Sequence, residues 1–383
     1  MKMKMMIGAA CLGALLTACG GASKPEAPPP PPVNPVLTGP ALQTEVERIR
    51  AANGLPGLTV VIVQNGQIEA VTAGKRRADG AAAIASTDQF QLGSLTKAAS
   101  AMLIARLVEQ KKLRWDSTLS ELFPDWHAGM HPSLRTVTVE QILHHRAGFK
   151  RDIDEADAVI LRPLATGNVK LDRATAARNL LQQAPAFTPD SRFHYSNVGY
   201  MLAGLIAEHA GGDSYETLME KDVFGPLQMK AAFGIPEDAG LAALSGHELS
   251  GKNWMPAAYY AEQRQALALY IPAGGLMVSM ADYGKYLKEH LQGLQGKSSF
   301  LSEATFRRIH TPIDNYGLGW MIHTEPGLGA VSIHDGSFQT YFAITALIPS
   351  KNRAVAVVCN CWSPAAVTAV EDFAERLAKA GSN

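Results

Sequence analysis

The sequence lacks several patterns by which common hydrolases are recognised. It contains no Gly-x-Ser-x-Gly segment, which argues against the nucleophile elbow of an α/β-hydrolase. It contains no His-Glu-x-x-His segment, which argues against a zinc peptidase of that type. Neither charge is in excess, with 35 Lys and Arg against 35 Asp and Glu in 383 residues. Nucleic-acid-binding proteins usually carry a clustered basic face, so we expect no nucleic-acid partner, and we also expect no metal and no cofactor.

Cysteine is also scarce, and only Cys359 and Cys361 lie beyond the first 19 residues. They occur in an apolar, β-rich run, where positions i and i+2 share a face at a spacing of about 6.6 Å. That spacing is near the upper limit for a disulfide. We expect two thiols packed as small hydrophobic groups, with an oxidised or metal-binding pair as the alternative.

The N-terminus has the features of a targeting segment. Two lysines among the first four residues precede an apolar run, Met5 to Leu16, which is too short to span a bilayer and is typical of a signal-peptide core. The run ends in Leu16-Thr17-Ala18-Cys19, which resembles the lipobox of bacterial lipoproteins. That resemblance implies removal of residues 1–18 and a lipid on Cys19, which would hold the chain to the cell envelope. Gly20 follows instead of Asp, which implies the outer membrane facing the periplasm in a Gram-negative cell. The alternative is a plain secretory signal with an incidental cysteine.

Residues 19–40 are rich in proline, with an unbroken run from Pro28 to Pro32. Proline fixes φ and removes a backbone donor, so we expect an extended tether between the lipid and the folded domain. A recognition motif for a proline-binding partner is the alternative.

Strand signals occur near both ends of the chain. Leu58 to Val63 and Ile68 to Thr72 are β-rich runs separated by Asn65-Gly66, a strong hairpin signal. Further strands are expected at 319–324, 330–333, 340–348 and 353–360. Helices are expected at 45–52, 98–108, 197–211, 215–223 and 371–380, and the middle of the chain shows no alternation of period two. We therefore predict an α/β (α+β) fold with one antiparallel sheet built from both chain ends. Residues 41–92 plus 266–383 would form this lobe, and residues 93–265 an inserted, mostly helical lobe.

Ser94-Leu95-Thr96-Lys97 opens the helix expected at 98–108, which is apolar nearly all round and therefore buried. Positions i and i+3 share a helix face, so the Ser94 hydroxyl and the Lys97 amine can meet. A lysine in a buried site loses its charge more easily, and a neutral amine can take the serine proton. Taken alone, the motif also fits a serine N-cap followed by a lysine that reaches solvent.

Tyr195-Ser196-Asn197 stands directly before the helix expected at 197–211. A tyrosinate is stabilised near a lysine ammonium, so the Tyr195 phenol can relay a proton to a leaving group. Asn197 can hold the lysine and a substrate carbonyl. Taken alone, a tyrosine before a helix is more often a packing residue.

His334-Asp335-Gly336-Ser337 lies at the end of an expected strand. Gly336 permits close approach of a substrate to the backbone. The N–H of Ser337, together with that of Ser94, can form an oxyanion hole. Taken alone, the segment also fits an ordinary turn.

Together and in this order, the three segments resemble the serine β-lactamase and penicillin-binding-protein family, in particular the branch with class C β-lactamases, D-aminopeptidases and related esterases. The resemblance covers residues 41–380 and implies a β-lactamase/transpeptidase-like fold. Four further segments support it: Leu143-His144-His145-Arg146-Ala147-Gly148, Phe224-Gly225-Pro226-Leu227-Gln228-Met229, Pro272-Ala273-Gly274-Gly275-Leu276 and Tyr316-Gly317-Leu318-Gly319-Trp320.

The resemblance implies Ser94 as nucleophile, Lys97 as its activator and Tyr195 as proton shuttle and deacylation base. It implies Asn197 as a positioning group and leaves the acylation base open between Lys97 and Tyr195. His334 stands where many members have the lysine of a K-T-G motif. Histidine is mostly neutral at pH 7, and Asp335 would repel a carboxylate if it faced the cleft. We therefore expect a monomeric serine acyl hydrolase that forms an acyl-enzyme with small-molecule or peptide acyl substrates, on esters, amides or peptides.

Two other functions remain open. The chain could be an efficient β-lactamase or a D,D-peptidase, or a catalytically idle envelope protein that binds muropeptides.

Two local patterns carry less weight as evidence of a metal or cation site. Adjacent His144 and His145 diverge too far to share a metal. The acidic residues Asp152, Asp154, Glu155 and Asp157 are better explained by a solvated loop than by a cation site.

Overall fold

The computed structural model describes residues 35–153, 166–240, 243–259, 261–338 and 340–381. The expected signal peptide, Cys19 and the proline run lie outside these residues, as do Asp154, Glu155 and Asp157 of the acidic segment. Within the described part, none of the helices combines the length and the apolar character needed to cross a bilayer.

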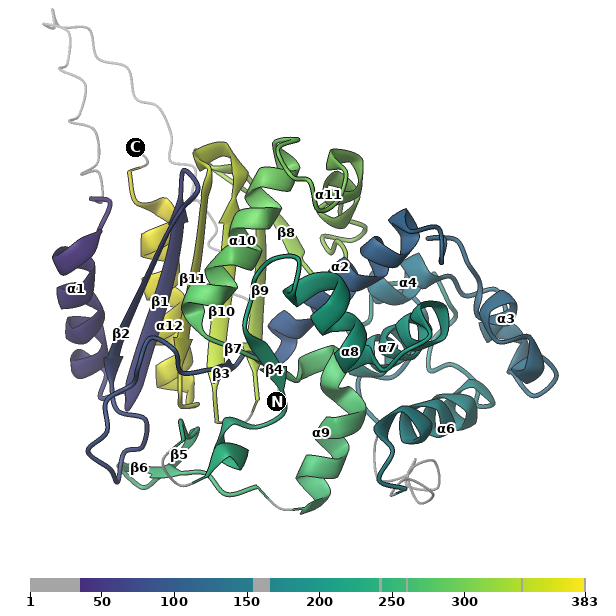
Figure 1. Cartoon of the computed structure of the whole chain (residues 1–383), viewed down its shortest axis with the longest axis horizontal. Coiled ribbons are helices and arrows are strands. Elements are labelled where there is room, and N and C mark those ends of the chain that lie inside the picture. Colours follow the sequence, from purple (N-terminus) through teal and green to yellow (C-terminus); the bar gives the residue numbers. More distant parts are fainter. Residues whose placement is uncertain (1–34, 154–165, 241–242, 260, 339, 382–383) are drawn as a thin grey trace, which may run out of the picture.

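Both ends of the chain build one antiparallel sheet, as predicted (Figure 1). The strand order is β2-β1-β11-β10-β9-β8, so an N-terminal hairpin pairs with the C-terminal strands, and Leu58 lies opposite Cys359. Cys359 and Cys361 are both buried free thiols, as expected. The six strands are β1 (Gly57–Gln64), β2 (Gln67–Gly74), β8 (Met321–Glu325), β9 (Gly329–Ser337), β10 (Phe342–Ile348) and β11 (Arg353–Cys359).

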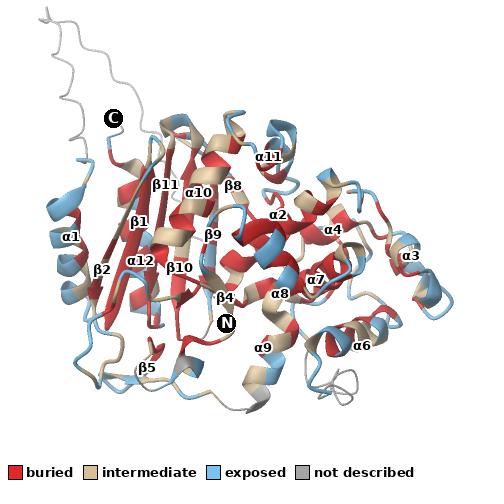
Figure 2. Cartoon of the chain, in the orientation of Figure 1, coloured by how far each residue is buried: buried red, intermediate tan, exposed pale blue. Residues whose placement is uncertain are grey.

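Helices cover both faces of this sheet, which explains why β1 is buried at every position from Gly57 to Val63. Val60 and Ile62 pack into a core with α1 (Gly39–Ala52) and α12 (Pro364–Lys379) on one face. Val61 and Val63 belong to a second core that includes α10 (Met280–Leu294) and continues into the helical lobe. Figure 2 shows the central strands buried between these two layers.

The helical lobe surrounds α2 (Thr96–Glu109), which is buried on nearly all sides, as its composition predicted (Figure 2). It contacts α7 and α9 most extensively, and these two helices also pack on each other. The remaining helices are α3 (Leu119–Leu122), α4 (Val139–Leu143), α6 (Val169–Leu181), α7 (Asn197–Gly211), α8 (Tyr215–Met219), α9 (Ala261–Gly274) and α11 (Glu303–Ile309).

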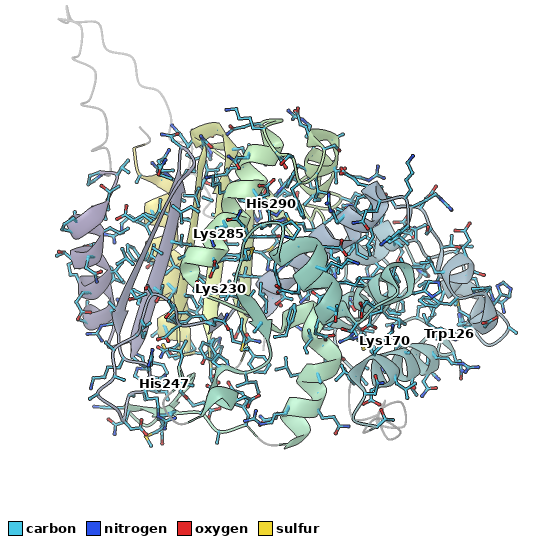
Figure 3. All side chains as sticks on the ribbon, in the orientation of Figure 1. Trp126, Lys170, Lys230, His247, Lys285 and His290 are labelled. Carbon is cyan, nitrogen blue, oxygen red and sulfur yellow. The ribbon has the colours of Figure 1, made fainter. Side chains whose placement is uncertain are left out.

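The middle of the chain also contains short strands that the sequence did not predict. Three of them form a small sheet in the order β3-β7-β4, and two form a hairpin. Each is too short for a period of two to be visible in the sequence. His247 of the hairpin, labelled in Figure 3, donates from Nδ1 to the carbonyl of Asn360 just after β11, at 2.7 Å. The strands are β3 (Phe90–Gln91), β4 (Ala231–Phe233), β5 (His247–Ser250), β6 (Asn253–Pro256) and β7 (Leu276–Val278).

Three expected helices have different bounds. The first begins at Gly39 and not at Glu45. The last one begins at Pro364 and not at Glu371, because Ser363 caps it by accepting a 3.1 Å hydrogen bond from the Ala366 N–H. The one expected at 215–223 is α-helical only to Met219. It then widens into a single π-type turn, in which the Gly225 N–H donates to the Glu220 carbonyl at 2.8 Å.

Candidate active site

Ser94 lies in a 3₁₀ turn, Gly93–Leu95, immediately before α2. The sequence placed it in the helix itself, and the structure puts it one short turn earlier. Gly93 has φ +54°, and a Cβ there would lie 2.6 Å from the Ser337 nitrogen, so only glycine fits. The turn is closed by Thr96, whose hydroxyl donates to the Gly93 carbonyl at 2.7 Å. The turn that holds Ser94 packs against β9 and α9.

Lys97 lies beneath Ser94 and is completely buried. Its Nζ is 2.9 Å from Ser94 Oγ, 2.7 Å from Asn197 Oδ1 and 2.7 Å from the Ala273 carbonyl. Burial lowers the pKa of Lys97 well below its usual range, and the nearby charge of Asp152 only partly opposes this. A neutral amine at this position can accept the proton of the Ser94 hydroxyl.

Tyr195 lies on the other side of Lys97, whose Nζ is 4.8 Å from the centre of the tyrosine ring. Burial of the phenol raises the pKa of Tyr195, and its interaction with the Ser94 hydroxyl only partly offsets that rise. The sequence suggested that a lysine ammonium would favour the tyrosinate. With Lys97 pushed towards its neutral form, the resting side chain is instead a phenol that can donate a proton.

Asn197 is the first residue of α7, and its amide connects two other side chains. Its Oδ1 accepts from Lys97, and its Nδ2 donates to Asp152 Oδ1 at 2.7 Å. The Asp152 carboxylate can only accept, so it binds the Nδ2 group and leaves Oδ1 directed at Lys97. The sequence assigned Asp152 to a solvated loop. The structure places it beside Asn197, the partner of Lys97, and no pattern of residue types revealed this contact.

The oxyanion hole expected from the Ser94 and Ser337 N–H groups has a geometric basis. The Phe338 N–H donates to the carbonyl of Tyr341, the residue before β10. Neighbouring N–H groups of a strand point in opposite directions, so that of Ser337 points away from β10, towards the Ser94 turn. Gly336 allows this approach, because a Cβ there would lie 2.0 Å from the Leu92 carbonyl oxygen and 3.0 Å from the Ser94 nitrogen.

His334 is buried behind Tyr195, with the two ring centres 6.2 Å apart. Its Nδ1 donates to the Asp335 carbonyl at 2.6 Å, so its Nε2 accepts from the Tyr316 hydroxyl at 3.0 Å. Burial lowers the pKa of His334, which makes the ring neutral. It is not among the described residues that line the cavity at Ser94, and Asp335 is exposed and is not among them either.

His145 is a further residue of the site whose role the sequence did not reveal. Its ring centre lies 4.4 Å from that of Tyr195, and its Nδ1 accepts the Ser196 N–H at 3.0 Å. It is buried and has φ +58°. Burial lowers the pKa of His145 well below its usual range. His145 belongs to the segment from Leu143 to Gly148 that supported the family resemblance. That segment indicated the family but did not predict a contact with Tyr195.

Ser94 opens onto a cavity of about 570 Å³, a size typical of small-molecule sites. We call Arg151, Asp152 and Asn197 the polar wall of this cavity. Gln263, Ala266, Leu267 and Tyr270 line it from one face of α9, and Phe338 lines it just after β9. Among the described residues, no group of three or more His, Cys, Asp or Glu side chains is arranged to hold a metal ion.

The fold and the serine beside a buried lysine are those of β-lactamases and penicillin-binding proteins. The family described as Beta-lactamase matches residues 42–380. The chain belongs to this family, whose members are serine hydrolases of the β-lactamase and penicillin-binding type.

Individual proteins and solved structures of this family are also similar to the chain. Penicillin-binding protein 4 of Amycolatopsis lactamdurans is 22% identical over 337 residues, covering 83% of this chain and 84% of that protein. Protein flp of Staphylococcus aureus (strain MW2) is 24% identical over 327 residues, covering 83% of this chain and 62% of that protein. The crystal structure of SurE aligns with a TM-score of 0.73 and 25% identity, covering 89% of this chain and 75% of SurE. The octameric penicillin-binding protein homologue from Pyrococcus abyssi aligns with a TM-score of 0.69 and 26% identity, covering 88% and 77%.

Proposed function

We propose that this chain hydrolyses acyl compounds through an acyl-enzyme on Ser94. The observation that carries the proposal is the buried Lys97 Nζ, held 2.9 Å from Ser94 Oγ by two further hydrogen bonds. A lysine with a purely structural role would not need to contact the hydroxyl of a serine that lines a cavity.

In the acylation step, neutral Lys97 takes the Ser94 proton while Oγ attacks the substrate carbonyl. The N–H groups of Ser94 and Ser337 stabilise the oxyanion. The bond to the leaving group then breaks, and the Tyr195 phenol supplies the proton that the leaving group needs. This leaves a Lys97 ammonium beside a Tyr195 phenolate, a pair in which each charge stabilises the other.

Deacylation reverses these proton movements. The Tyr195 phenolate takes a proton from water, whose oxygen attacks the acyl carbon. Ser94 leaves and recovers its proton from Lys97. Protons balance over the cycle, Lys97 is the base in acylation, and Tyr195 is the base in deacylation.

Esters, amides or peptides are the proposed substrates in preference to β-lactams. The support is His334, which is neutral, turned towards Tyr316 and absent from the described lining of the cavity. It therefore offers no cation for a β-lactam carboxylate. A structure of SurE with D-Leu exists, with a TM-score of 0.70 to this chain. A fold of this shape thus takes an amino acid as ligand in SurE, which favours including peptides.

Hydrolysis of p-nitrophenyl butyrate by the chain from residue 35, with a chromogenic cephalosporin in parallel, tests the proposal. Ester turnover that is absent in Ser94→Ala, with little cephalosporin cleavage, is the expected result. Rapid cephalosporin cleavage would instead establish a β-lactamase. A folded protein that turns over neither compound, and takes up no acyl group by mass spectrometry, would favour the idle muropeptide-binding protein.

We also propose that the mature protein is anchored in the cell envelope through a lipid on Cys19. The support is the lipobox-like segment and the proline-rich stretch that follows it. Full-length protein expressed in a Gram-negative host should partition with the outer membrane, and Cys19→Ala should abolish lipid labelling. Labelling that persists in the variant would refute this.

A further inference from the structure

The charged residues that line the cavity lie on one wall. Of the described lining residues, Arg151 is the only one with a positive charge, and its side chain is 70% exposed. Lys97 is buried beneath the cavity and already has three hydrogen-bond partners. His334 is neutral and hidden. Any negative group on a bound substrate therefore has Arg151 as its available cation.

Arg151 is well anchored for such a role. Its backbone carbonyl accepts the N–H groups of Asn197 and Val198, at 2.7 and 3.3 Å, and so caps the start of α7. The guanidinium carbon lies 5.4 Å from the centre of the Tyr195 ring, within the range of a cation–π contact. The arginine is thus tied to the same helix start that carries Asn197.

The pairing of Arg151 with Asp152 is loose enough to be exchanged. Arg151 Nε is 3.4 Å from Asp152 Oδ2, and the two side chains are 70% and 50% exposed. Exposed pairs of this kind contribute little to stability. Asp152 has its shorter bond elsewhere, to Asn197 at 2.7 Å. A guanidinium can form two parallel hydrogen bonds with a carboxylate. The single contact between Arg151 Nε and Asp152 does not use this capacity.

We propose that Arg151 is a carboxylate-binding subsite at the polar wall of the acyl cavity. This inference rests on the proposed function and specifies the substrates of the enzyme. They are acyl compounds that carry a carboxylate together with an apolar group. The apolar part would contact Leu267 and Phe338, which also line the cavity. The subsite lies at the start of α7 beside Tyr195 and not on β9, the strand on which His334 replaces lysine.

Aryl boronic acids test the subsite, because boron forms a tetrahedral adduct with a nucleophilic serine. Inhibition constants would be compared for phenylboronic acid and its 3-carboxy and 4-carboxy derivatives. In the unmodified protein, at least one derivative should bind about tenfold more tightly than the parent, the scale of one charge-assisted hydrogen bond. Arg151→Ala should remove that preference and Arg151→Glu should reverse it, while phenylboronic acid binds both variants with little change.

Arg307→Glu provides the matched control for net charge, since Arg307 is exposed on α11, pairs with Glu303 and does not line this cavity. It should keep the preference for the carboxylate. Equal binding of all three compounds to the unmodified protein, or a preference that survives Arg151→Ala, would overturn the subsite. Absence of both ester turnover and phenylboronic acid binding would instead refute Ser94 as nucleophile, which distinguishes the two failures.

Discussion

Asp152 fixes the orientation of Asn197, because its Oδ1 accepts a 2.7 Å hydrogen bond from the Asn197 Nδ2 group. The Oδ1 of Asn197 is thereby directed at Lys97 Nζ. Asp152 thus acts on Lys97 in two ways, by orienting its partner Asn197 and by its charge. The charge tends to raise the pKa of Lys97, although burial has the larger, opposite effect.

Two substitutions of Asp152 should separate orientation from charge. Asp152→Ala loses the hydrogen bond and should lower kcat about tenfold or more, whereas Asp152→Asn retains an acceptor and should lower it less. Both remove a negative charge near Lys97, so its pKa should fall further and the amine should stay neutral to lower pH. The acid limb of the kcat/KM profile should therefore move to lower pH in both variants.

Asp190→Asn is a suitable control, since Asp190 pairs with Arg146 and does not line the cavity. A purely structural role for Asp152 would lower the melting temperature but leave the acid limb where it is. That result would contradict the chain from Asp152 through Asn197 to Lys97.

Tyr195→Phe should slow hydrolysis by about a hundredfold, the lower range for loss of a general acid–base group. With the base for deacylation gone, the acyl-enzyme should accumulate and be visible as a mass increase on Ser94. Tyr286→Phe is the control, because Tyr286 is a fully buried tyrosine of α10 that is absent from the cavity lining. If Tyr195→Phe deacylates at the normal rate, another group must activate the water.

Gly336→Ala should abolish activity without a change in any catalytic side chain. The added Cβ would lie 2.0 Å from the Leu92 carbonyl oxygen, so the end of β9 must move away from the Ser94 turn. We expect a loss of about 1–3 kcal/mol in stability and a larger loss of kcat, because the two N–H groups of the oxyanion hole separate. In Gly129→Ala the nearest atom is 3.8 Å from the Cβ, so activity should be kept. Normal turnover by Gly336→Ala would remove this strand from the oxyanion hole.

The parts of the site that the sequence predicted are those encoded by local spacing or by motif. Ser94 and Lys97 meet because they are three residues apart at the start of a helix, and Asn197 was placed by the helix that it begins. The Ala273 carbonyl, by contrast, reaches Lys97 from 176 positions away. The segment from Pro272 to Leu276 indicated the family, but a contact made by a backbone carbonyl leaves no mark in a side-chain pattern. Asp152 approaches Asn197 through a loop, and loop conformation has no periodic signal. The same limit applied to the short strands β3 and β7, whose pairing depends on tertiary contacts.

Two histidines outside the active site predict how stability depends on pH. His290 of α10, labelled in Figure 3, is completely buried, and its Nδ1 is 2.9 Å from Nε2 of His310. Burial lowers the pKa of His290 well below its usual range and that of half-buried His310 to about 3. Both rings are therefore neutral in the folded protein at neutral pH.

An unfolded chain binds protons on these histidines below about pH 6.5, whereas the folded protein does not until far lower pH. Stability is thus fully present above pH 6.5 and is lost as the pH falls below it, by up to about 1.4 kcal/mol per pH unit for each histidine. His290→Asn should be less stable at pH 7, because it leaves a cavity beside Trp320, but its stability should fall less steeply between pH 6 and 4.5. Urea unfolding of both proteins across that range measures the difference in slope. Equal slopes would mean that His290 is already protonated in the folded protein, in conflict with its burial.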